Sequence, residues 1–218
     1  RQGGNAFDAA VAVSAALAVV EPSSSGLGGG GFWLIHRAED DFETMVDARE
    51  VAPLAATHDM FLDAQGNVVK GRSTSTALAA GIPGEPAGFE HISKTYGKLP
   101  FKAVLQPAIR LAREGFPLNQ RLRGGIVAKQ DTFDAGAAAK VFLVNGEVPA
   151  VGTIIKQPDL AKTLTVLAEQ GAEGFYTGPV AKQLVDGVKK LGGIWSLQDL
   201  ASYEVKERKP VYGEYRGA

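Results

Sequence analysis

The sequence predicts a layered α+β fold in which helices outnumber strands. Three observations support this prediction: an alanine-rich helical segment near the start, a pair of strand-like runs after a glycine-rich loop, and a long block of helical patterns in the second half. The chain has 218 residues, 45% of them hydrophobic, which is enough for one substantial core. We expect residues 1–218 to belong to one incomplete domain, because the sequence starts and stops without ordinary terminal signals.

The first predicted element is a helix from Ala6 to Val20. Apart from Asp8 and Ser14 its residues are almost all Ala, Val and Leu, and Asn5 is a suitable N-cap. About 15 residues are fewer than the ~20 needed to cross a bilayer, so the run indicates a buried helix and no membrane span. Its many alanines would let it pack closely against a neighbouring layer such as a sheet.

Two strands are expected to follow as a hairpin, from Phe32 to His36 and from Glu43 to Arg49. With the first helix and the glycine-rich loop they make up a core segment, residues 1–56. A polar loop continues to Thr76, with a turn at Gln65-Gly66-Asn67.

The second half of the sequence predicts a mainly helical block over residues 85–200 and return strands over residues 204–216. Pro158 and Pro179 suit the first turn of a helix, and Ser196 is a suitable cap for a last short helix ending at Leu200. The other expected helices are Ala87 to Tyr96, Phe101 to Arg113 and Leu118 to Lys129; those begun by the two prolines end at Gln170 and Leu191, and the late strands are Glu204 to Lys206 and Val211 to Tyr215.

The run from Gly26 to Gly31 fits the G-x-G-x-x-G pattern of dinucleotide-binding loops. That motif needs a strand before it and a helix after it, so that the helix N-terminus faces the phosphates. Here the expected order is the reverse, which argues against nucleotide binding. The glycines are better explained by tight turning, positive φ angles and close approach to another backbone or a ligand.

Composition excludes several other functions. Lys and Arg total 23 against 24 Asp and Glu, so no long-range field attracts nucleic acid. The chain contains no cysteine, which rules out disulfides, thiolate metal sites and a cysteine nucleophile. His36, His58 and His91 lack metal-ligand spacing and are expected to be structural or solvent-facing. We expect no metal site and no cofactor.

The charged cluster Asp47-Ala48-Arg49-Glu50 is the candidate for chemistry, because it closes an apolar strand. Alternation along the strand would put Asp47 and Arg49 on one face and Glu50 on the other. One interpretation is a local ion pair at a strand end, which contributes little if it is exposed. The other is that Arg49 binds a ligand carboxylate through its two-pronged guanidinium.

Several ordered stretches across nearly the whole chain resemble the γ-glutamyltransferase (γ-glutamyltranspeptidase) family. The resemblance implies the large-subunit portion of such an enzyme. The matching stretches are Gly3 to Ala10, Glu21 to Phe32, Asp47 to Pro53, Gly81 to Gly84, Tyr96 to Pro100, Gln106 to Ala108, Gln157 to Ala161 and Gly174 to Gly178, followed by Gly192-Gly193, Asp199-Leu200 and Tyr212 to Arg216.

The resemblance implies part of the four-layer αββα sandwich of N-terminal nucleophile hydrolases. In that family an autoprocessed precursor gives two subunits, and the N-terminal Thr of the small subunit attacks the γ-glutamyl amide. A terminal amine can serve as base for its own residue's hydroxyl. Arg49 matches the arginine that holds the donor's α-carboxylate, which favours its ligand-binding interpretation. No catalytic residue is expected in this chain, and its partners would be the small subunit and glutathione or another γ-glutamyl compound.

Two other functions remain open at this stage. A related acylase, of the cephalosporin acylase or poly-γ-glutamate-processing kind, would depend on residues outside this chain. A non-catalytic homologue would keep the pocket without processing itself. The family resemblance also implies a periplasmic or secreted location.

Overall fold

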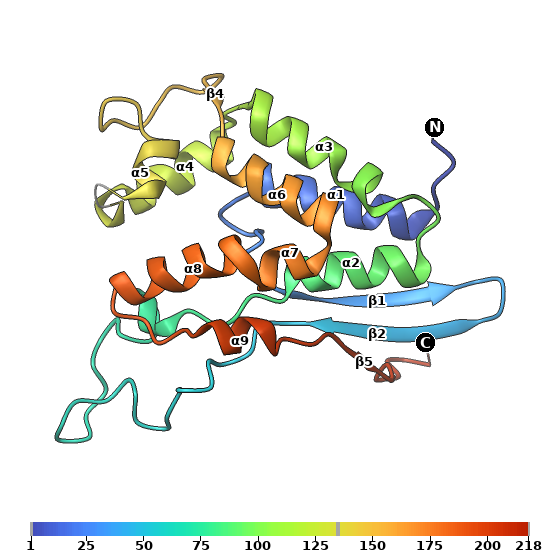
Figure 1. The fold of residues 1–218 in the computed structure, drawn as a ribbon, viewed down its shortest axis with the longest axis horizontal. Helices are drawn as coiled ribbons and strands as arrows, with labels where there is room; N and C mark the ends of the chain where they lie inside the picture. The colour runs from blue at the N-terminus through green and yellow to red at the C-terminus, as the bar shows by residue number, and fades with distance from the viewer. Residues whose placement is uncertain (1, 134–135, 218) are drawn as a thin grey trace. The chain divides into compact units, whose positions relative to one another are not determined.

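The computed structural model describes residues 2–133 and 136–217 of a mixed α/β chain, shown in Figure 1. The chain forms two compact units, each built from two separate stretches of sequence. The first unit comprises Arg1–Gly26 and Ser93–Gly171, and the second comprises Leu27–Ile92 and Ala172–Ala218. Each unit has its own packing.

The first unit is centred on helix α3 (Phe101–Glu114), which packs against α1 (Ala6–Val20) and α6 (Pro158–Gln170). Every fourth residue or so of α1 is buried, including Val11, Ala15 and Val19, whereas Val13 remains exposed. Small alanines on the packed stripes of these helices let their backbones approach closely. No helix in the described stretches of the chain is long and apolar enough to cross a membrane.

The start of α1 is fixed by a reciprocal cap. The Asn5 side chain accepts hydrogen bonds from the backbone N–H groups of Phe7 and Asp8, and the Asp8 carboxylate accepts from the Asn5 N–H. Asp8 also accepts from the N–H groups of Lys98 and Leu99, at 3.0 Å and 3.2 Å. One buried carboxylate therefore joins the beginning of α1 to the loop before α3.

The rest of the first unit consists of short elements. Asn119 caps the helix that begins at Gln120 through the Leu122 N–H, and Gly115, with a φ of 94°, ends α3 where few other residues could. The elements are β3 (Phe116–Pro117), which pairs with β4 (Ile154–Ile155), then α4 (Gln120–Lys129), the 3-10 turn η2 (Gln130–Thr132) and α5 (Ala137–Phe142).

The second unit contains a three-stranded antiparallel sheet in the order β1-β2-β5. Strand β1 (Gly31–Arg37) and β2 (Phe42–Ala48) form a hairpin, and β5 (Lys206–Arg208) pairs with β2 so that Lys206 lies opposite Asp47. Helix α2 (Glu85–Tyr96) carries the chain into the first unit, and its Phe89 meets Trp33 of β1 edge to face.

The remaining elements of the second unit are η1 (Ala77–Ala79), α7 (Ala172–Tyr176), α8 (Gly178–Lys190) and α9 (Leu197–Ala201). Ser196 caps α9 in a reciprocal capping box with Asp199. The other Asp199 oxygen accepts the Leu54 N–H at 2.5 Å, which ties the loop after the hairpin to this helix.

Most predicted elements are confirmed to within two residues, including the helix at 6–20, both hairpin strands and the Ser196 cap. The expected strand from Val211 to Tyr215 is wrong, because those residues form no strand and Val211 is 95% exposed. The late strand pairs at 206–208 instead of 204–206, where its register meets β2. The short helices α5 and α7 were not predicted. The proposed segment scheme of 1–56, 85–200 and 204–216 stays a prediction.

Candidate functional site

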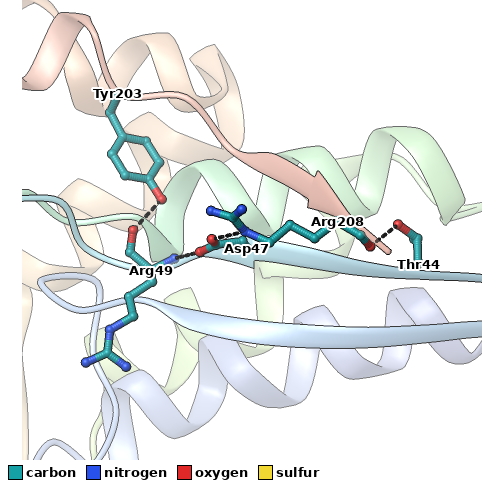
Figure 2. Close-up of polar contacts among 5 residues, drawn as sticks. All are labelled: Thr44, Asp47, Arg49, Tyr203 and Arg208. Atoms are coloured by element: carbon teal, nitrogen blue, oxygen red, sulfur yellow. Dashed lines mark hydrogen bonds and ion pairs between the residues drawn. The ribbon is translucent and has the colours of Figure 1, made fainter. Parts of the chain in front are cut away.

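Arg49 lies one residue beyond the end of β2 and is exposed. Figure 2 shows its guanidinium pointing away from Asp47 and Arg208. Because the strand stops at Ala48, the alternation that predicted a common face for Asp47 and Arg49 does not extend to Arg49. Across residues 2–133 and 136–217 its guanidinium makes no ion pair, so the local Asp47–Arg49 pair is absent there.

The ion pair at this strand end forms between Asp47 and Arg208 of β5. The Arg208 Nε donates to Asp47 Oδ2 at 2.7 Å, while Asp47 Oδ1 accepts the backbone N–H of Arg49 at 3.1 Å (Figure 2). Burial by itself would raise the pKa of Asp47, but these hydrogen bonds outweigh it and hold that pKa below its usual range. Asp47 therefore stays a carboxylate, and its two oxygens accept hydrogen bonds from the Arg49 backbone N–H and from Arg208 of β5. In the described part of the chain it forms no ion pair with the Arg49 side chain.

The carbonyl of Arg49 is held from the other side by Tyr203. The Tyr203 hydroxyl donates to the Arg49 carbonyl oxygen at 2.8 Å, as Figure 2 shows. Beyond it, Val51 and Ile82 exchange two backbone hydrogen bonds, of 3.3 Å and 2.8 Å. The main chain around the arginine is thus fixed although its side chain is exposed.

The guanidinium of Arg49 lies over one aromatic ring. Its Cζ atom is 5.9 Å from the ring centroid of Phe32, at the start of β1. This distance is at the outer limit of a cation–π interaction. Phe32 is itself 53% exposed, so the pair presents an apolar surface beside a cationic fork. A carboxylate with an attached carbon chain suits such a surface.

The glycine-rich loop comes close to this strand end through Gly30. A Cβ atom on Gly30 would lie 2.3 Å from the Ala48 carbonyl oxygen and 2.9 Å from the Arg49 Cα. The predicted close approach of the loop to another backbone is therefore confirmed at Gly30. The predicted positive φ is wrong, because no glycine from 26 to 31 is in that region. The observed order of helix, loop and strand also agrees with the argument against a nucleotide loop.

None of the three histidines is among the residues that contact the Arg49 backbone through the hydrogen bonds described above. Each has a carboxylate neighbour: His36 with Glu43 at 3.1 Å, His58 with Asp59 at 2.7 Å, and His91 with Glu207 at 2.8 Å. In the part of the chain that the structure describes, no three His, Cys, Asp or Glu side chains are grouped to hold a metal ion.

Hollows of about 460, 360 and 570 Å³ occur elsewhere in the described residues of the two units, and Arg49 lines none of these three. The first is apolar and lies between α4 and α5, the second lies beside the start of α1, and the third lies beside α8 and α9. Of their lining residues, only Asp8 and Arg110 in the second hollow, Lys129 in the first and Lys182 in the third carry charge.

Sequence reasoning pointed to Arg49, whose role stays a prediction, but it missed the groups that hold its backbone. Tyr203 and Arg208 come from a segment more than 150 positions further along the chain, and nothing local in the sequence joins them to Arg49. A weak signal existed at Gly84, where a Cβ would lie 2.1 Å from both the Ala48 carbonyl oxygen and the Tyr203 hydroxyl. A glycine at that position indicates a crowded backbone but not which residues crowd it.

A family model described as Gamma-glutamyltranspeptidase matches residues 1–218. The glutathione hydrolase proenzyme of Escherichia coli (strain K12) is 43% identical over 219 residues, covering 100% of this chain and 38% of that protein. The crystal structure of Helicobacter pylori gamma-glutamyltranspeptidase has a TM-score of 0.95 and 46% identity, over 100% of this chain and 62% of that one. For cephalosporin acylase from Bacillus halodurans the TM-score is 0.84 and the identity 31%, over 99% and 41% of the chains. This chain thus spans less than two thirds of each of these proteins.

Proposed function

Because this chain belongs to the γ-glutamyltranspeptidase family, we propose that it is the large-subunit part of an enzyme that cleaves γ-glutamyl amides such as glutathione. The structural likeness confirms the layered α+β class and the N-terminal nucleophile hydrolase fold that the sequence resemblance implies. The activity, the substrate and the partner subunit are proposals, since the chain covers 38% of the E. coli relative.

The observation that carries the proposal is the geometry of Arg49. Its guanidinium is exposed and unpaired in the described residues, whereas its N–H and C=O are both hydrogen-bonded. Such a residue offers a fixed, bidentate site for a carboxylate and loses little conformational freedom in its main chain on binding. We assign to it the α-carboxylate of the γ-glutamyl donor.

The chemistry would be completed by the N-terminal Thr of a small subunit from the same precursor. Its hydroxyl attacks the γ-carbonyl carbon and passes its proton to the leaving amine, which departs as the C–N bond breaks. The resulting γ-glutamyl ester is then attacked by water, which releases glutamate, or by an acceptor amine, which forms a new γ-glutamyl amide. Arg49 holds the donor through both steps and takes no proton.

The experiment is a substitution in the full-length, processed protein. Arg49→Ala should raise KM for glutathione or a γ-glutamyl anilide about 30-fold or more, because losing a paired charged contact costs ~2 kcal/mol at least. Arg110→Ala, which removes an exposed arginine on α3, is the matched control and should leave KM unchanged. Unaltered kinetics in Arg49→Ala would refute the role of Arg49 in binding the substrate.

A second experiment tests whether the nucleophile lies outside this chain. Residues 1–218 alone, purified and folded, should release no glutamate from glutathione, whereas the full-length protein should. Turnover by the isolated chain that scales with its concentration would show a nucleophile within it.

The acylase alternative has one supporting observation, the 31% identity to a cephalosporin acylase. The 43% identity to a glutathione hydrolase favours the γ-glutamyl reaction. Parallel assays with a γ-glutamyl anilide and a cephalosporin-type acyl amide discriminate the two. A poly-γ-glutamate-processing enzyme would act on long γ-linked chains, and a non-catalytic homologue would show no autocleavage of its precursor. From the family resemblance we also propose a periplasmic or secreted location, which cell fractionation tests.

A further inference from the structure

The Arg49 carbonyl receives its hydrogen bond from a tyrosine that is itself held on several sides. Tyr203 follows α9, and its N–H donates to the Leu200 carbonyl oxygen at 3.0 Å. Its ring stacks on the Tyr176 ring, with centroids 5.4 Å apart and planes 8° from parallel. The Tyr176 hydroxyl in turn donates to the Pro83 carbonyl oxygen at 2.8 Å. The Tyr203 hydroxyl is therefore a donor with a fixed position.

Space for this hydroxyl is provided by Gly84. A Cβ atom at that position would lie 2.1 Å from the Tyr203 hydroxyl and 2.1 Å from the Ala48 carbonyl oxygen. Only a residue without a side chain lets the tyrosine reach the end of β2. At the same strand end, Gly30 leaves room for the Ala48 carbonyl oxygen and the Arg49 Cα atom. Two glycines and one tyrosine thus crowd the backbone on either side of the Arg49 Cα atom: Gly84 lies against the Ala48 carbonyl, and Tyr203 contacts the Arg49 carbonyl.

The Tyr203 hydroxyl remains protonated over the pH range in which an enzyme works. Burial, with the negative charges of Asp47, Glu50 and Glu85, raises the pKa of Tyr203 to about 12. A neutral tyrosine can donate to a carbonyl oxygen, whereas a phenolate cannot.

We propose that Tyr203 is a positioning residue for Arg49: by hydrogen-bonding the Arg49 carbonyl it fixes the direction in which the guanidinium meets the donor carboxylate. This inference rests on the proposed function of Arg49. Arg49 lies beyond the ladder of β2. Without the Tyr203 hydroxyl, the one backbone hydrogen bond that Arg49 keeps within residues 2–133 and 136–217 is that of its N–H to Asp47. A binding group that is held less firmly recognises its ligand more weakly.

The test compares Tyr203→Phe with Tyr176→Phe in the full-length, processed protein. Both substitutions keep the stacked rings and delete one hydroxyl that donates to a backbone carbonyl, but only Tyr203 reaches Arg49. Tyr203→Phe should raise KM for a γ-glutamyl anilide about 3- to 10-fold, the effect of one ordinary hydrogen bond, and leave kcat within about twofold. Tyr176→Phe keeps the ring that stacks on Tyr203, and it should lower the Tm while raising KM by less than Tyr203→Phe does.

A double-mutant cycle separates this inference from the proposed function. In an Arg49→Ala background, Tyr203→Phe should change KM no further, because the group that it positions is gone. If Arg49→Ala raises KM and Tyr203→Phe does not, the positioning role is wrong while the proposed function stands. Equal KM increases in the two tyrosine variants, or an additive increase in the double mutant, would also overturn it. No effect of Arg49→Ala would refute the proposed function itself.

Discussion

Gly30 passes so close to Ala48 that a Cβ atom on Gly30 would lie 2.3 Å from the Ala48 carbonyl oxygen. Real Cβ atoms do not approach backbone atoms so closely, and the atom in the way cannot rotate aside as a side chain could. The loop before β1 and the end of β2 must therefore keep their present separation for the site at Arg49 to exist. The glycines of this loop therefore differ in whether a side chain could be added at their position without moving the backbone.

We predict that Gly30→Ala impairs the protein and Gly28→Ala does not. The Gly30 variant must push the loop away from Ala48 and Arg49, whereas a Cβ on Gly28 meets no atom within 4 Å and Gly28 has no positive φ. Thermal unfolding and KM for a γ-glutamyl anilide measure the two effects. Gly30→Ala should lower the Tm and raise KM. A variant at position 30 that matches the parent in both would show that the loop moves freely.

Removal of the Asp199 carboxylate should lower the free energy of unfolding substantially. Asp199 is 3% exposed, caps α9 through Ser196 and accepts the Leu54 N–H. Asp199→Ala leaves these donors unsatisfied and should reduce the free energy of unfolding by about 2 to 3 kcal/mol. Asp186→Ala, which removes an exposed carboxylate on α8, is the control and should cost less than about 0.5 kcal/mol. Urea denaturation measures both, and similar midpoints for the two variants would contradict the prediction.

The Asp8 carboxylate should account for part of the stability that the first unit loses at low pH. Burial would raise its pKa, but the N–H groups of Asn5, Lys98 and Leu99 outweigh burial and lower the pKa from its ordinary value of 3.8. A carboxyl group with a depressed folded-state pKa stabilises the fold above its unfolded pKa. That stabilisation is lost as the pH falls through the folded value.

Asp8→Asn should therefore be less stable than the parent at pH 7, and the difference should shrink as the pH falls from about 5 to about 2. Denaturant midpoints across this range provide the measurement. The exposed Asp159, which pairs with Lys162, supplies the control through Asp159→Asn. A constant gap between Asp8→Asn and the parent at every pH would mean that the charge of Asp8 contributes nothing.

Much of the fold could be predicted because its signals are local. The helix Ala6–Val20 combines an unbroken apolar run with Asn5 as its cap, and Pro158 begins α6 at the predicted residue. These features depend on residues within a few positions of one another. The glycine-rich loop was rejected as a nucleotide site on element order alone, which is also a local property.

The predictions were wrong where contacts between distant parts of the chain determine the local structure. Val211 to Tyr215 alternates like a strand, but the ladder with β2 ends where Arg208 lies opposite Met45, and Pro210 just beyond it has no N–H with which to extend the pairing. Arg49 looked like a strand residue, yet β2 stops at Ala48 because the chain must turn toward Tyr203 and Ile82. The residues that hold the Arg49 backbone could not be inferred from sequence spacing, because Tyr203 lies 154 positions further along the chain.

The third strand of the sheet has a consequence for how this protein is made. Arg208 reaches Asp47 across 161 positions, so the hairpin leaves the ribosome long before β5 exists. At ~5–20 residues per second this interval is on the order of 10–30 s. During that time β2 presents an unpaired edge, which is a template for pairing with other chains, so this strand exposes the nascent protein to aggregation.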